Sequence, residues 1–343
     1  MSAIGLGLDT TFDDTSVAIL RGKREVLANL TLSQYQDHEE FGGVVPERAS
    51  RKHLEVIHHL IADALKEAQL DFSDIDYIAV SNHPGLLGSL LVGLTVAKSL
   101  AYTLQCPLIG VNHVEAHPYA NVLTHGEMPF PVLHLVVAGG HTLLIKAKAH
   151  FDYKIIGRSL DDAAGECVDK VAKMFGHPMP GGPVVDRAAL EFPGDAFDFP
   201  RPLLHKNEHN FSFSGLKTAM LRFREKHPDI SSSSKNSSNP LLAEGPILAS
   251  FFQSVIDVLI HKTFKAAKIY GLNNISVSGG LAASRKLRSA FETEAARKGI
   301  KLFYPPPNLC TDNAAMVTCL AAQRFEEQQF DDLKLDAFPN LLS

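Results

Sequence analysis

The chain has 343 residues, of which 45% are hydrophobic and 21% are charged, and its formal net charge is −5. These proportions are typical of a folded globular protein and exclude a disordered or fibrous chain, while the length predicts two domains rather than one. The sequence shows neither an apolar run of about 18 residues nor a signal-peptide pattern, so we expect a cytoplasmic protein with no membrane partner. The four cysteines have no Cys-x-x-Cys spacing, which argues against a disulfide framework and a thiolate zinc site.

The N-terminal segment predicts a β-hairpin. Residues 4–9 and 16–20 have the composition of strands, and residues 10–15 form the polar turn between them. The turn carries hydroxyl groups, carboxylates and backbone N–H groups, which suit a phosphate or its metal ion. An ordinary polar hairpin turn explains the same pattern. The candidate phosphate or nucleotide contacts are Asp9, Thr10, Thr11 and Asp13.

The next part of the chain predicts a partly parallel sheet and a second hairpin. An amphipathic helix is followed by a strand, a helix and a strand, at residues 47–69, 76–80, 89–101 and 107–111. A hairpin at 132–146 then repeats the plan of the first one, which predicts a weak internal duplication. Its turn is Gly139-Gly140-His141, and adjacent glycines let a backbone approach an anion closely.

A histidine pair follows the strand at 107–111. His113 and His117 are four residues apart, so a helix would place both imidazoles on one face, where they can bind zinc or iron. A chance pair among 16 histidines is the alternative, and Pro118 predicts that His117 ends or kinks the helix. A metal site needs a third ligand. Asp312 lies where a loop enters a helix and is our candidate, with an N-cap as its alternative role.

Residues 159–175 predict a helix with an acidic start. Ser159 and Asp162 resemble a capping box, so we interpret Asp161 and Asp162 as helix-start charges. Asp169 is either such a charge or a ligand contact. Farther along, a rigid turn with exposed amides is expected at 179–183.

The last third of the chain predicts a polar low-complexity loop at 231–239, a helix at 248–270 and a strand at 274–278. Gly279-Gly280 follows this strand and opens a helix, which is a nucleotide-contacting geometry but a weak motif by itself.

Taken together, the polar motifs resemble one known family. They are Asp9-Thr10-x-x-Asp13-Asp14-Thr15, Tyr35-Gln36, Phe41-Gly42-Gly43-Val44-Val45-Pro46-Glu47, His113-x-x-x-His117, Gly139-Gly140-His141-Thr142, Asp161-Asp162-Ala163-Ala164-Gly165-Glu166, Pro180-Gly181-Gly182-Pro183, Phe211-Ser212-Phe213-Ser214-Gly215-Leu216-Lys217 and Thr311-Asp312-Asn313. Their order is similar to that of the TsaD family, the tRNA N6-adenosine threonylcarbamoyltransferases once called O-sialoglycoprotein endopeptidases or glycoproteases. The resemblance covers nearly the whole chain and is closest to the bacterial or organellar branch.

The resemblance implies an α/β fold of the two-lobed actin-like/Hsp70-like ATPase (ASKHA) type, with duplicated mixed-sheet lobes and the active site in the cleft between them. We expect residues 1–125, completed by a C-terminal helix at 314–343, to form the first lobe and residues 126–313 the second. The implied reaction transfers a threonylcarbamoyl group from threonylcarbamoyl-AMP to N6 of adenosine 37 in tRNAs that read codons beginning with A, which is t6A modification.

The resemblance also implies site residues. The metal ligands would be His113, His117 and Asp312, holding one divalent ion, with Fe2+ favoured over Zn2+, and ATP with Mg2+ is a further candidate ligand. The residues implied for substrate binding are Val136, Val137, Ala138, Gly139, Gly140, Asp169, Gly182, Asp186 and Ser284. No residue is named as general base. The chain departs from the family pattern at Asp9, Phe12, His83, Ala138 and Ser284, where Glu, Cys, Gly, Ser and Asn are usual.

The resemblance further implies tRNA, TsaB-like and TsaE-like subunits and a threonylcarbamoyl-AMP synthase as partners. Because the chain is acidic overall, RNA contact requires local positive charge or a partner. We expect Arg48, Arg51, Lys52 and Lys217 to supply such charge.

Three other functions compete with this interpretation. A sugar or carbamoyl kinase of the same fold would share the phosphate-binding hairpins but has no need of His113, His117 and Asp312. A metal-dependent peptidase would be expected to contain His-Glu-x-x-His, which this sequence lacks. A non-catalytic scaffold would be expected to have lost the three metal ligands.

Overall fold

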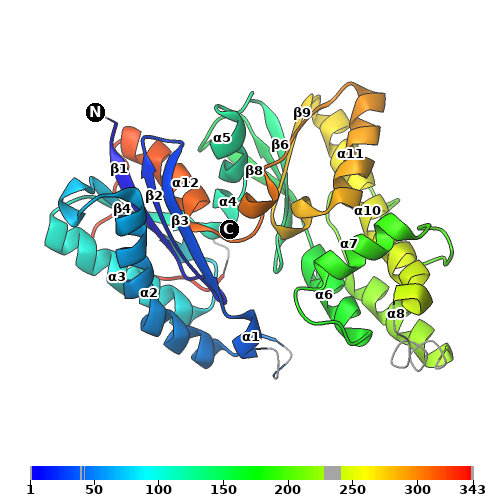
Figure 1. Ribbon diagram of the computed structural model, residues 1–343. Coiled ribbons are helices and arrows are strands. Elements are labelled where there is room, and N and C mark those ends of the chain that lie inside the picture. Colours follow the sequence, from blue (N-terminus) through cyan, green and yellow to red (C-terminus); the bar gives the residue numbers. More distant parts are fainter. Residues whose placement is uncertain (1, 39–40, 42, 228–240, 341–343) are drawn as a thin grey trace. The chain divides into compact units, whose positions relative to one another are not determined.

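The structure, a computed structural model, describes residues 2–38, 41, 43–227 and 241–340, so the loop expected at 231–239 lies outside the described residues. The chain divides into two compact units (Figure 1). The first unit comprises Met1–Met128 and Thr311–Ser343, and the second comprises Pro129–Cys310. Asp312 therefore belongs to the first unit.

The first unit is built on a five-stranded mixed sheet with the order β3-β2-β1-β4-β5. Its strands are β1 (Ile4–Asp9), β2 (Asp14–Arg21), β3 (Glu25–Ser33), β4 (Tyr77–His83) and β5 (Leu108–Asn112). β1 is antiparallel to β2 and parallel to β4, and β4 is parallel to β5. This arrangement confirms the N-terminal hairpin and the parallel strand pair. β3 was not predicted, because it is an edge strand of mixed exposure.

The second unit repeats this sheet. Its order is β8-β7-β6-β9-β10, with β6 (Val132–Val137), β7 (Thr142–Ala147), β8 (Tyr153–Arg158), β9 (Asn274–Ser278) and β10 (Lys301–Phe303). β6 is antiparallel to β7 and parallel to β9, as β1 is to β2 and β4. β9 is in turn parallel to β10. The two sheets therefore share one topology, which confirms the predicted duplication.

Helices cover both sheets. Those of the first unit are α1 (Tyr35–His38), α2 (Pro46–Ala68), α3 (Leu87–Leu104), α4 (His113–Ala116), α5 (Tyr119–His125) and α12 (Ala314–Glu326), with a 3-10 turn η2 (Phe72–Asp74). Those of the second are α6 (Ala164–Met174), α7 (Gly182–Glu191), α8 (Ser214–Lys226), α10 (Leu241–Tyr270) and α11 (Arg285–Lys298), with 3-10 turns η3 (Gly280–Ala283) and η4 (Pro307–Leu309).

Two of these helices are long and apolar enough to cross a membrane if judged by length and composition, α3 and the part of α10 from Ala243 to Tyr270. In α10, 72% of the apolar window is buried inside the structure, and in α3 the share is 33%. Leu90 and Leu94 of α3 belong to the core of the first unit, and Phe251 and Phe252 of α10 belong to that of the second. Both helices therefore contribute apolar side chains to a core.

Two helix boundaries differ from the prediction. α6 begins at Ala164 rather than at residue 159. Residues 159–163 precede it as a loop, in which the Asp161 carboxylate accepts the Phe213 N–H. The C-terminal helix ends at Glu326 and does not reach residue 343. Acidic residues are unfavourable at a helix C-terminus, and Gln328 adopts a positive φ of 55°. The following segment instead bonds to β4 and β5, for example from the Phe338 N–H to the Asn82 carbonyl at 3.0 Å.

The contact between β1 and α12 depends on Gly7. A Cβ atom at this position would lie 1.9 Å from Thr318 Oγ1, which itself donates to the Ala314 carbonyl inside the helix. The strand and the helix are therefore too close for a side chain at residue 7.

We expect Gly7→Ala to lower the free energy of unfolding by about 1–3 kcal/mol, as overpacking does, in urea denaturation. Gly280→Ala is the control, because a Cβ at Gly280 meets no atom within 4 Å and should be nearly neutral. Equal losses in the two variants would contradict the packing argument.

Candidate functional site

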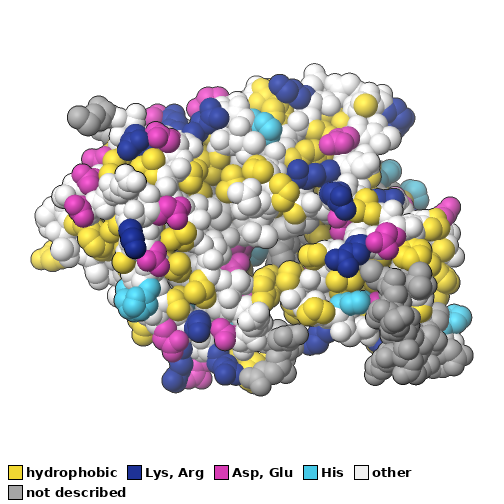
Figure 2. Space-filling view, in the orientation of Figure 1, with side chains coloured by type: hydrophobic (Ala, Val, Ile, Leu, Met, Phe, Trp, Pro, Cys, Tyr) yellow, Lys and Arg dark blue, Asp and Glu magenta, His cyan; other side chains and the backbone are white. Residues whose placement is uncertain are grey.

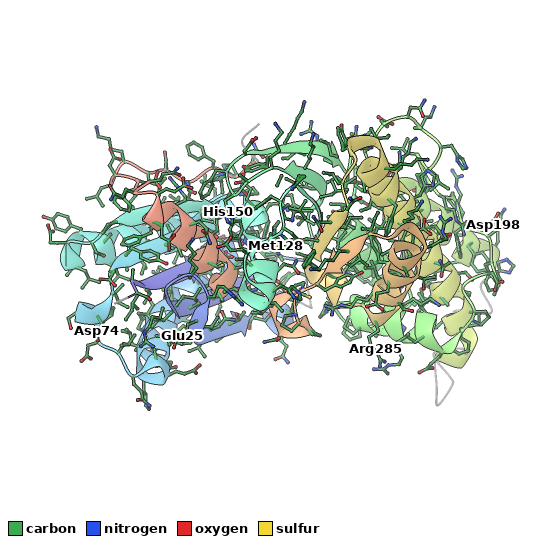
Figure 3. The ribbon with its side chains drawn as sticks, turned by 90° about the horizontal axis from the view of Figure 1, so that it is seen from above. Glu25, Asp74, Met128, His150, Asp198 and Arg285 are labelled. Atoms are coloured by element: carbon green, nitrogen blue, oxygen red, sulfur yellow. The ribbon has the colours of Figure 1, made fainter. Side chains whose placement is uncertain are left out.

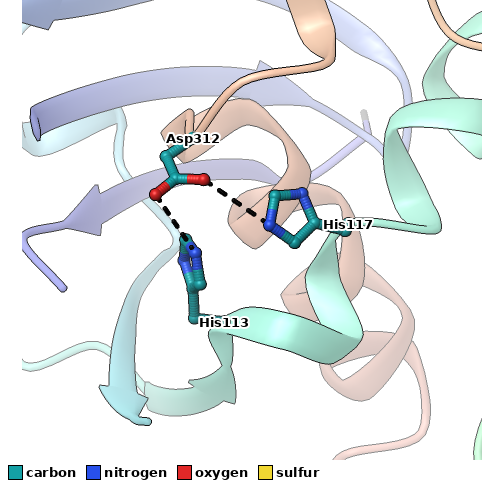
Figure 4. Close-up of side chains that lie close together, drawn as sticks. All are labelled: His113, His117 and Asp312. Atoms are coloured by element: carbon teal, nitrogen blue, oxygen red, sulfur yellow. Dashed lines mark ion pairs between the residues drawn. The ribbon is translucent and has the colours of Figure 1, made fainter. Parts of the chain in front are cut away.

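Three side chains of the first unit lie close together (Figure 4). His113 Nε2 lies 3.4 Å from Asp312 Oδ2, and His117 Nε2 lies 3.5 Å from Asp312 Oδ1. One ligand atom of each residue lies within 4.8 Å of the others. The structure thus brings together the three residues that the sequence suggested as one group.

The spacing of the three side chains fits one metal ion. Imidazole nitrogen and carboxylate oxygen bind ions such as zinc at about 2.0–2.2 Å, so two ligand atoms of a tetrahedral ion lie about 3.4 Å apart. The separations of 3.4 and 3.5 Å agree with this value and are longer than usual charge-assisted hydrogen bonds. Both histidines are buried, whereas the Asp312 side chain is 26% exposed. The donor set therefore suits a metal and is accessible on the side of Asp312.

The positions of the two histidines follow from how the short helix α4 begins and ends. Asn112 begins α4 because its Oδ1 accepts the N–H groups of Val114 and Glu115 at 2.9 and 3.3 Å. α4 ends after one turn, and Pro118 precedes α5, so His117 lies at a helix junction as the proline predicted.

The N-cap of α12 is Asn313 rather than Asp312. Asn313 Oδ1 accepts the Met316 N–H at 3.0 Å. The alternative role of Asp312 as an N-cap is therefore wrong. Because Asn313 satisfies the helix end, the Asp312 carboxylate faces the histidines.

Asp9 contacts the second ring nitrogen of His113, Nδ1. Asp9 Oδ2 lies 2.8 Å from His113 Nδ1, and both side chains are buried. Asp9 Oδ1 accepts the Thr11 N–H at 3.2 Å. A carboxylate on Nδ1 fixes the tautomer that leaves Nε2 to bind a metal. The sequence indicated Asp9 as a phosphate contact, whereas the structure places its carboxylate on His113.

The sheet order contained a signal for this contact. β1, β4 and β5 are parallel, so their carboxyl ends share one edge of the sheet, which is where ligands gather in α/β folds. Asp9 ends β1, and His113 directly follows β5. The contact could have been inferred once the strand order was assumed.

The site is acidic. Burial lowers the pKa of His113, but the carboxylates of Asp9 and Asp312 outweigh it and raise this pKa well above its usual value. Burial, followed by the carboxylates of Asp13, Asp312 and Asp9, raises the pKa of Asp14 to about 7, although a hydrogen bond with Ser33 opposes it. These carboxylates favour bound positive charge.

The other residues of the hairpin turn are mostly buried and hydrogen-bonded inside the first unit. Thr10 and Thr11 are buried. Thr10 Oγ1 donates to the Ser89 carbonyl at 2.8 Å, and Thr11 Oγ1 lies 3.4 Å from His113 Nδ1. Asp13 is half-buried, and its carbonyl accepts the Gln34 N–H. Asp13 is thus the least enclosed of the turn residues predicted to contact phosphate.

In the second unit, the predicted substrate loop at 136–140 covers the last two residues of β6 and the turn that follows. Val136 and Val137 are fully buried and Ala138 is nearly so, whereas Gly139 and Gly140 are exposed. A Cβ at Gly279 would lie 2.5 Å from the Val137 carbonyl carbon, and Gly279 has a positive φ of 91°. Gly279 therefore serves close strand packing, and the exposed backbone belongs to Gly139 and Gly140.

Asp169 anchors the proline–glycine turn. Its Oδ1 accepts the Gly181 N–H at 2.7 Å. Burial raises the pKa of Asp169, and hydrogen bonds from the Gly181 and Gly182 N–H groups partly offset this effect. Gly182 begins α7, and no atom would meet a Cβ there within 4 Å. The turn therefore presents Gly182 as an open position.

Asp186 and Ser284 bind each other. Ser284 Oγ donates to Asp186 Oδ1 at 2.5 Å and accepts the Leu287 N–H at 3.0 Å as N-cap of α11. Asp186 also accepts the N–H groups of Arg285 and Lys286 at 3.2 and 3.1 Å. In this structure the two predicted substrate contacts hold the start of α11.

The sequence assigned Asp161 to the start of its own helix, which is wrong, because its carboxylate binds the start of α8. Its carboxylate accepts hydrogen bonds from Ser212 Oγ, the Phe213 N–H and the Ser214 N–H and Oγ at 2.5–3.2 Å. It therefore caps α8 rather than its own helix, and α6 has Ala163 as its N-cap residue, without a side-chain cap. The Asp-Asp-Ala-Ala-Gly-Glu and Phe-Ser-Phe-Ser-Gly-Leu-Lys motifs thus bind one another.

The basic residues proposed for RNA contact are mostly ion-paired. Lys217 pairs with Asp162, Arg51 with Glu47 and Lys52 with Asp37. The Arg48 guanidinium lies 4.6 Å from the centroid of the Phe41 ring.

We expect Asp161→Ala to lower the free energy of unfolding by about 0.5–2 kcal/mol at neutral pH, as loss of an N-cap does. Burial raises the pKa of Asp161, but hydrogen bonds from Ser212, Phe213 and Ser214 outweigh it and lower this pKa. The stabilisation is therefore complete above the unfolded-state pKa of about 3.9 and is lost as pH falls through the lower folded-state pKa. Chemical denaturation between about pH 3 and pH 7 measures it. A difference between wild type and variant that does not shrink in acid would contradict the assignment.

Comparison with solved structures supports the fold. HypF in its phosphate- and nucleotide-bound form has a TM-score of 0.60 at 14% identity, covering 96% of this chain and 47% of that one. The activator of the 2-hydroxyisocaproyl-CoA dehydratase from Clostridium difficile, with bound ADPNP, has a TM-score of 0.52 at 14% identity, covering 96% and 97%. With the duplicated sheets, these similarities show the predicted two-lobed ASKHA-type α/β fold.

Sequence comparison identifies the family. The family model of TsaD, tRNA N6-adenosine threonylcarbamoyltransferase, matches residues 25–319. The enzyme of that name from Clostridioides difficile (strain 630) is 43% identical over 98% of this chain and 98% of its own length. The one from Bacillus anthracis is 44% identical over 99% and 96%. The chain belongs to the TsaD family of tRNA N6-adenosine threonylcarbamoyltransferases and is a transferase that modifies tRNA.

Proposed function

We propose that this chain transfers the threonylcarbamoyl group of threonylcarbamoyl-AMP to N6 of adenosine 37, in tRNAs that read codons beginning with A, with one divalent metal ion at His113, His117 and Asp312. The observation that carries the proposal is the convergence of these three side chains within 4.8 Å in a member of this family. Two histidines and one carboxylate are the donor set of many iron(II) sites, so we propose Fe2+, with Zn2+ as the alternative.

The chain's own residues would divide the work as follows. When bound, the ion supplies Lewis acidity toward a carbonyl or phosphoryl oxygen. His113 and His117 would hold it through their imidazoles, and Asp312 would add a negative charge from the exposed side. Asp9 keeps a proton on His113 Nδ1 and orients the ring. The amine of adenine is a weak nucleophile, so the site has to activate the carbamoyl carbon, and we assign no general base.

The second unit would bind the rest of the substrate. The exposed backbone at Gly139 and Gly140 can donate to the phosphate of the AMP leaving group. Asp169 holds the turn that presents Gly182, and we propose that this turn contacts the threonyl or ribose portion. Asp186 and Ser284 would support this wall through α11. Val136, Val137 and Ala138 would contribute through their backbone.

We further propose that TsaB-like and TsaE-like subunits assist the chain in the cytoplasm, that a threonylcarbamoyl-AMP synthase supplies the substrate, and that ATP with Mg2+ is a ligand of the N-terminal hairpin turn. Exposed apolar side chains on α3, Leu91 at 42% and Tyr102 at 66%, offer a partner subunit an apolar surface.

Replacing His117 by alanine removes one of the three ligands. We expect the purified variant to lose bound iron or zinc in elemental analysis, and the threonylcarbamoyladenosine content of tRNA, measured by nucleoside mass spectrometry, to fall by more than about 100-fold. His59→Ala is the control, since His59 is an exposed histidine on α2. Normal metal content together with normal tRNA modification in His117→Ala would remove the assigned role.

Replacing Asp9 by asparagine removes the charge that orients His113. We expect metal affinity to fall by about 10–100-fold, as for other partners of metal-bound histidines, in a titration with Zn2+ against a competing chelator. Asp63→Asn makes the same chemical change at an exposed position of α2 and should leave the affinity unchanged. An Asp9→Asn variant that binds Zn2+ like the wild type would show that Asp9 only packs against the ring.

A further inference from the structure

The second unit contains a basic cavity apart from the residues assigned to the site. Its volume is about 330 Å³, and it is lined by Lys146, Lys148, Asp152, Tyr153, Lys154, Ile156 and Tyr270. These residues lie on β7, on β8, in the turn between them and at the end of α10, and the turn carries His150, which Figure 3 labels. Three lysines thus face one aspartate in a chain whose net charge is −5.

Strand pairing places two of these lysines directly opposite each other. Lys146 on β7 pairs with Lys154 on β8. Like charges in directly opposed positions destabilise a sheet. Lys154 lies on the edge strand β8, where lysine often prevents unwanted strand addition, but Lys146 lies on the inner strand β7, so edge protection does not explain Lys146. Lys148 contributes a third charge and is only loosely paired, with its Nζ 4.0 Å from Asp152 Oδ2.

An aromatic ring forms one wall. Lys146 Nζ lies 4.7 Å from the centroid of the Tyr270 ring, a cation–π contact that holds the lysine in place. The Tyr270 ring also lies 5.6 Å from the ring of His209. Burial lowers the pKa of His209, and Lys262 and Lys265 of α10 lower it further. Two further lysines of α10, the buried Lys262 and the half-buried Lys265, therefore lie near this ring.

We propose that this cavity binds the phosphodiester backbone of the tRNA substrate. A polyanion with regularly spaced charges suits several ammonium groups beside an aromatic ring. On the face shown in Figure 2, Lys, Arg, Asp and Glu side chains are scattered over both units. The inference rests on the proposed function, because that function makes tRNA the substrate.

The test compares two double variants of the full-length chain. Lys148→Glu/Lys154→Glu changes the cavity, and its new glutamate at 154 would face Lys146, so the fold is not threatened. Lys66→Glu/Lys226→Glu makes the same charge change at two exposed lysines outside the cavity. Binding of an unmodified tRNA transcript is measured by fluorescence anisotropy between about 50 and 200 mM salt. Thermal unfolding confirms that both variants are folded.

We expect the cavity variant to bind the transcript at least about 10-fold more weakly at the lowest salt, and its log–log salt slope to fall in magnitude by about one per lysine. Slopes and affinities equal to those of the control variant would overturn the inference. The binding assay contains no threonylcarbamoyl-AMP, and transfer is measured in a separate reaction to which it is added, so the two proposals are tested independently. Binding that depends on these lysines without any transfer would contradict the proposed function alone, and transfer with an unchanged slope would contradict this inference alone.

Discussion

The buried contact between Asp9 and His113 links the sheet to the candidate chemistry. A carboxylate removed from water needs a compensating partner, and here the partner is an imidazole whose other nitrogen faces Asp312. Neither residue can be moved without disturbing the end of a strand, because Asp9 ends the central strand β1 and His113 follows the edge strand β5. Parallel strand order therefore determines where the His113 Nε2 of the candidate metal site lies.

The two duplicated sheets differ in what lies at the carboxyl ends of their parallel strands. In the first unit the carboxyl ends of the parallel strands carry Asp9 and Asn112, which orient and position His113. In the second unit the carboxyl ends of β6 and β9, the counterparts of β1 and β4, are followed by Gly139 and Gly279. Gly279 lets the two strand ends approach, and Gly139 exposes the backbone. One topology thus supports a candidate side-chain site in one unit and exposed backbone at the same edge of the sheet in the other.

The sequence predicted the features that depend on local pattern. The four-residue spacing indicated that the side chains of His113 and His117 lie close together. The glycine pairs indicated the turn of the second hairpin and the end of the strand at 274–278. Apart from Asp312 with the two histidines, the sequence did not predict contacts between segments distant in the chain, such as Asp161 with Phe213 or Asp186 with Ser284. For Asp161, the local capping rule predicted a hydrogen bond to its own helix. The carboxylate instead accepts hydrogen bonds at the start of α8, where both of its oxygens find donors.

Local charge matters more than net charge for an acidic chain that modifies RNA. At physiological salt the Debye length is about 8 Å, so exposed charges several turns away are largely screened from a bound phosphate. Lys146 and Lys154, adjacent across two strands, lie well within this distance of each other. Their repulsion lowers the stability of the isolated strand pair, and a bound phosphate would relieve it. A net charge of −5 is therefore compatible with a polyanionic substrate, provided that such clusters meet it.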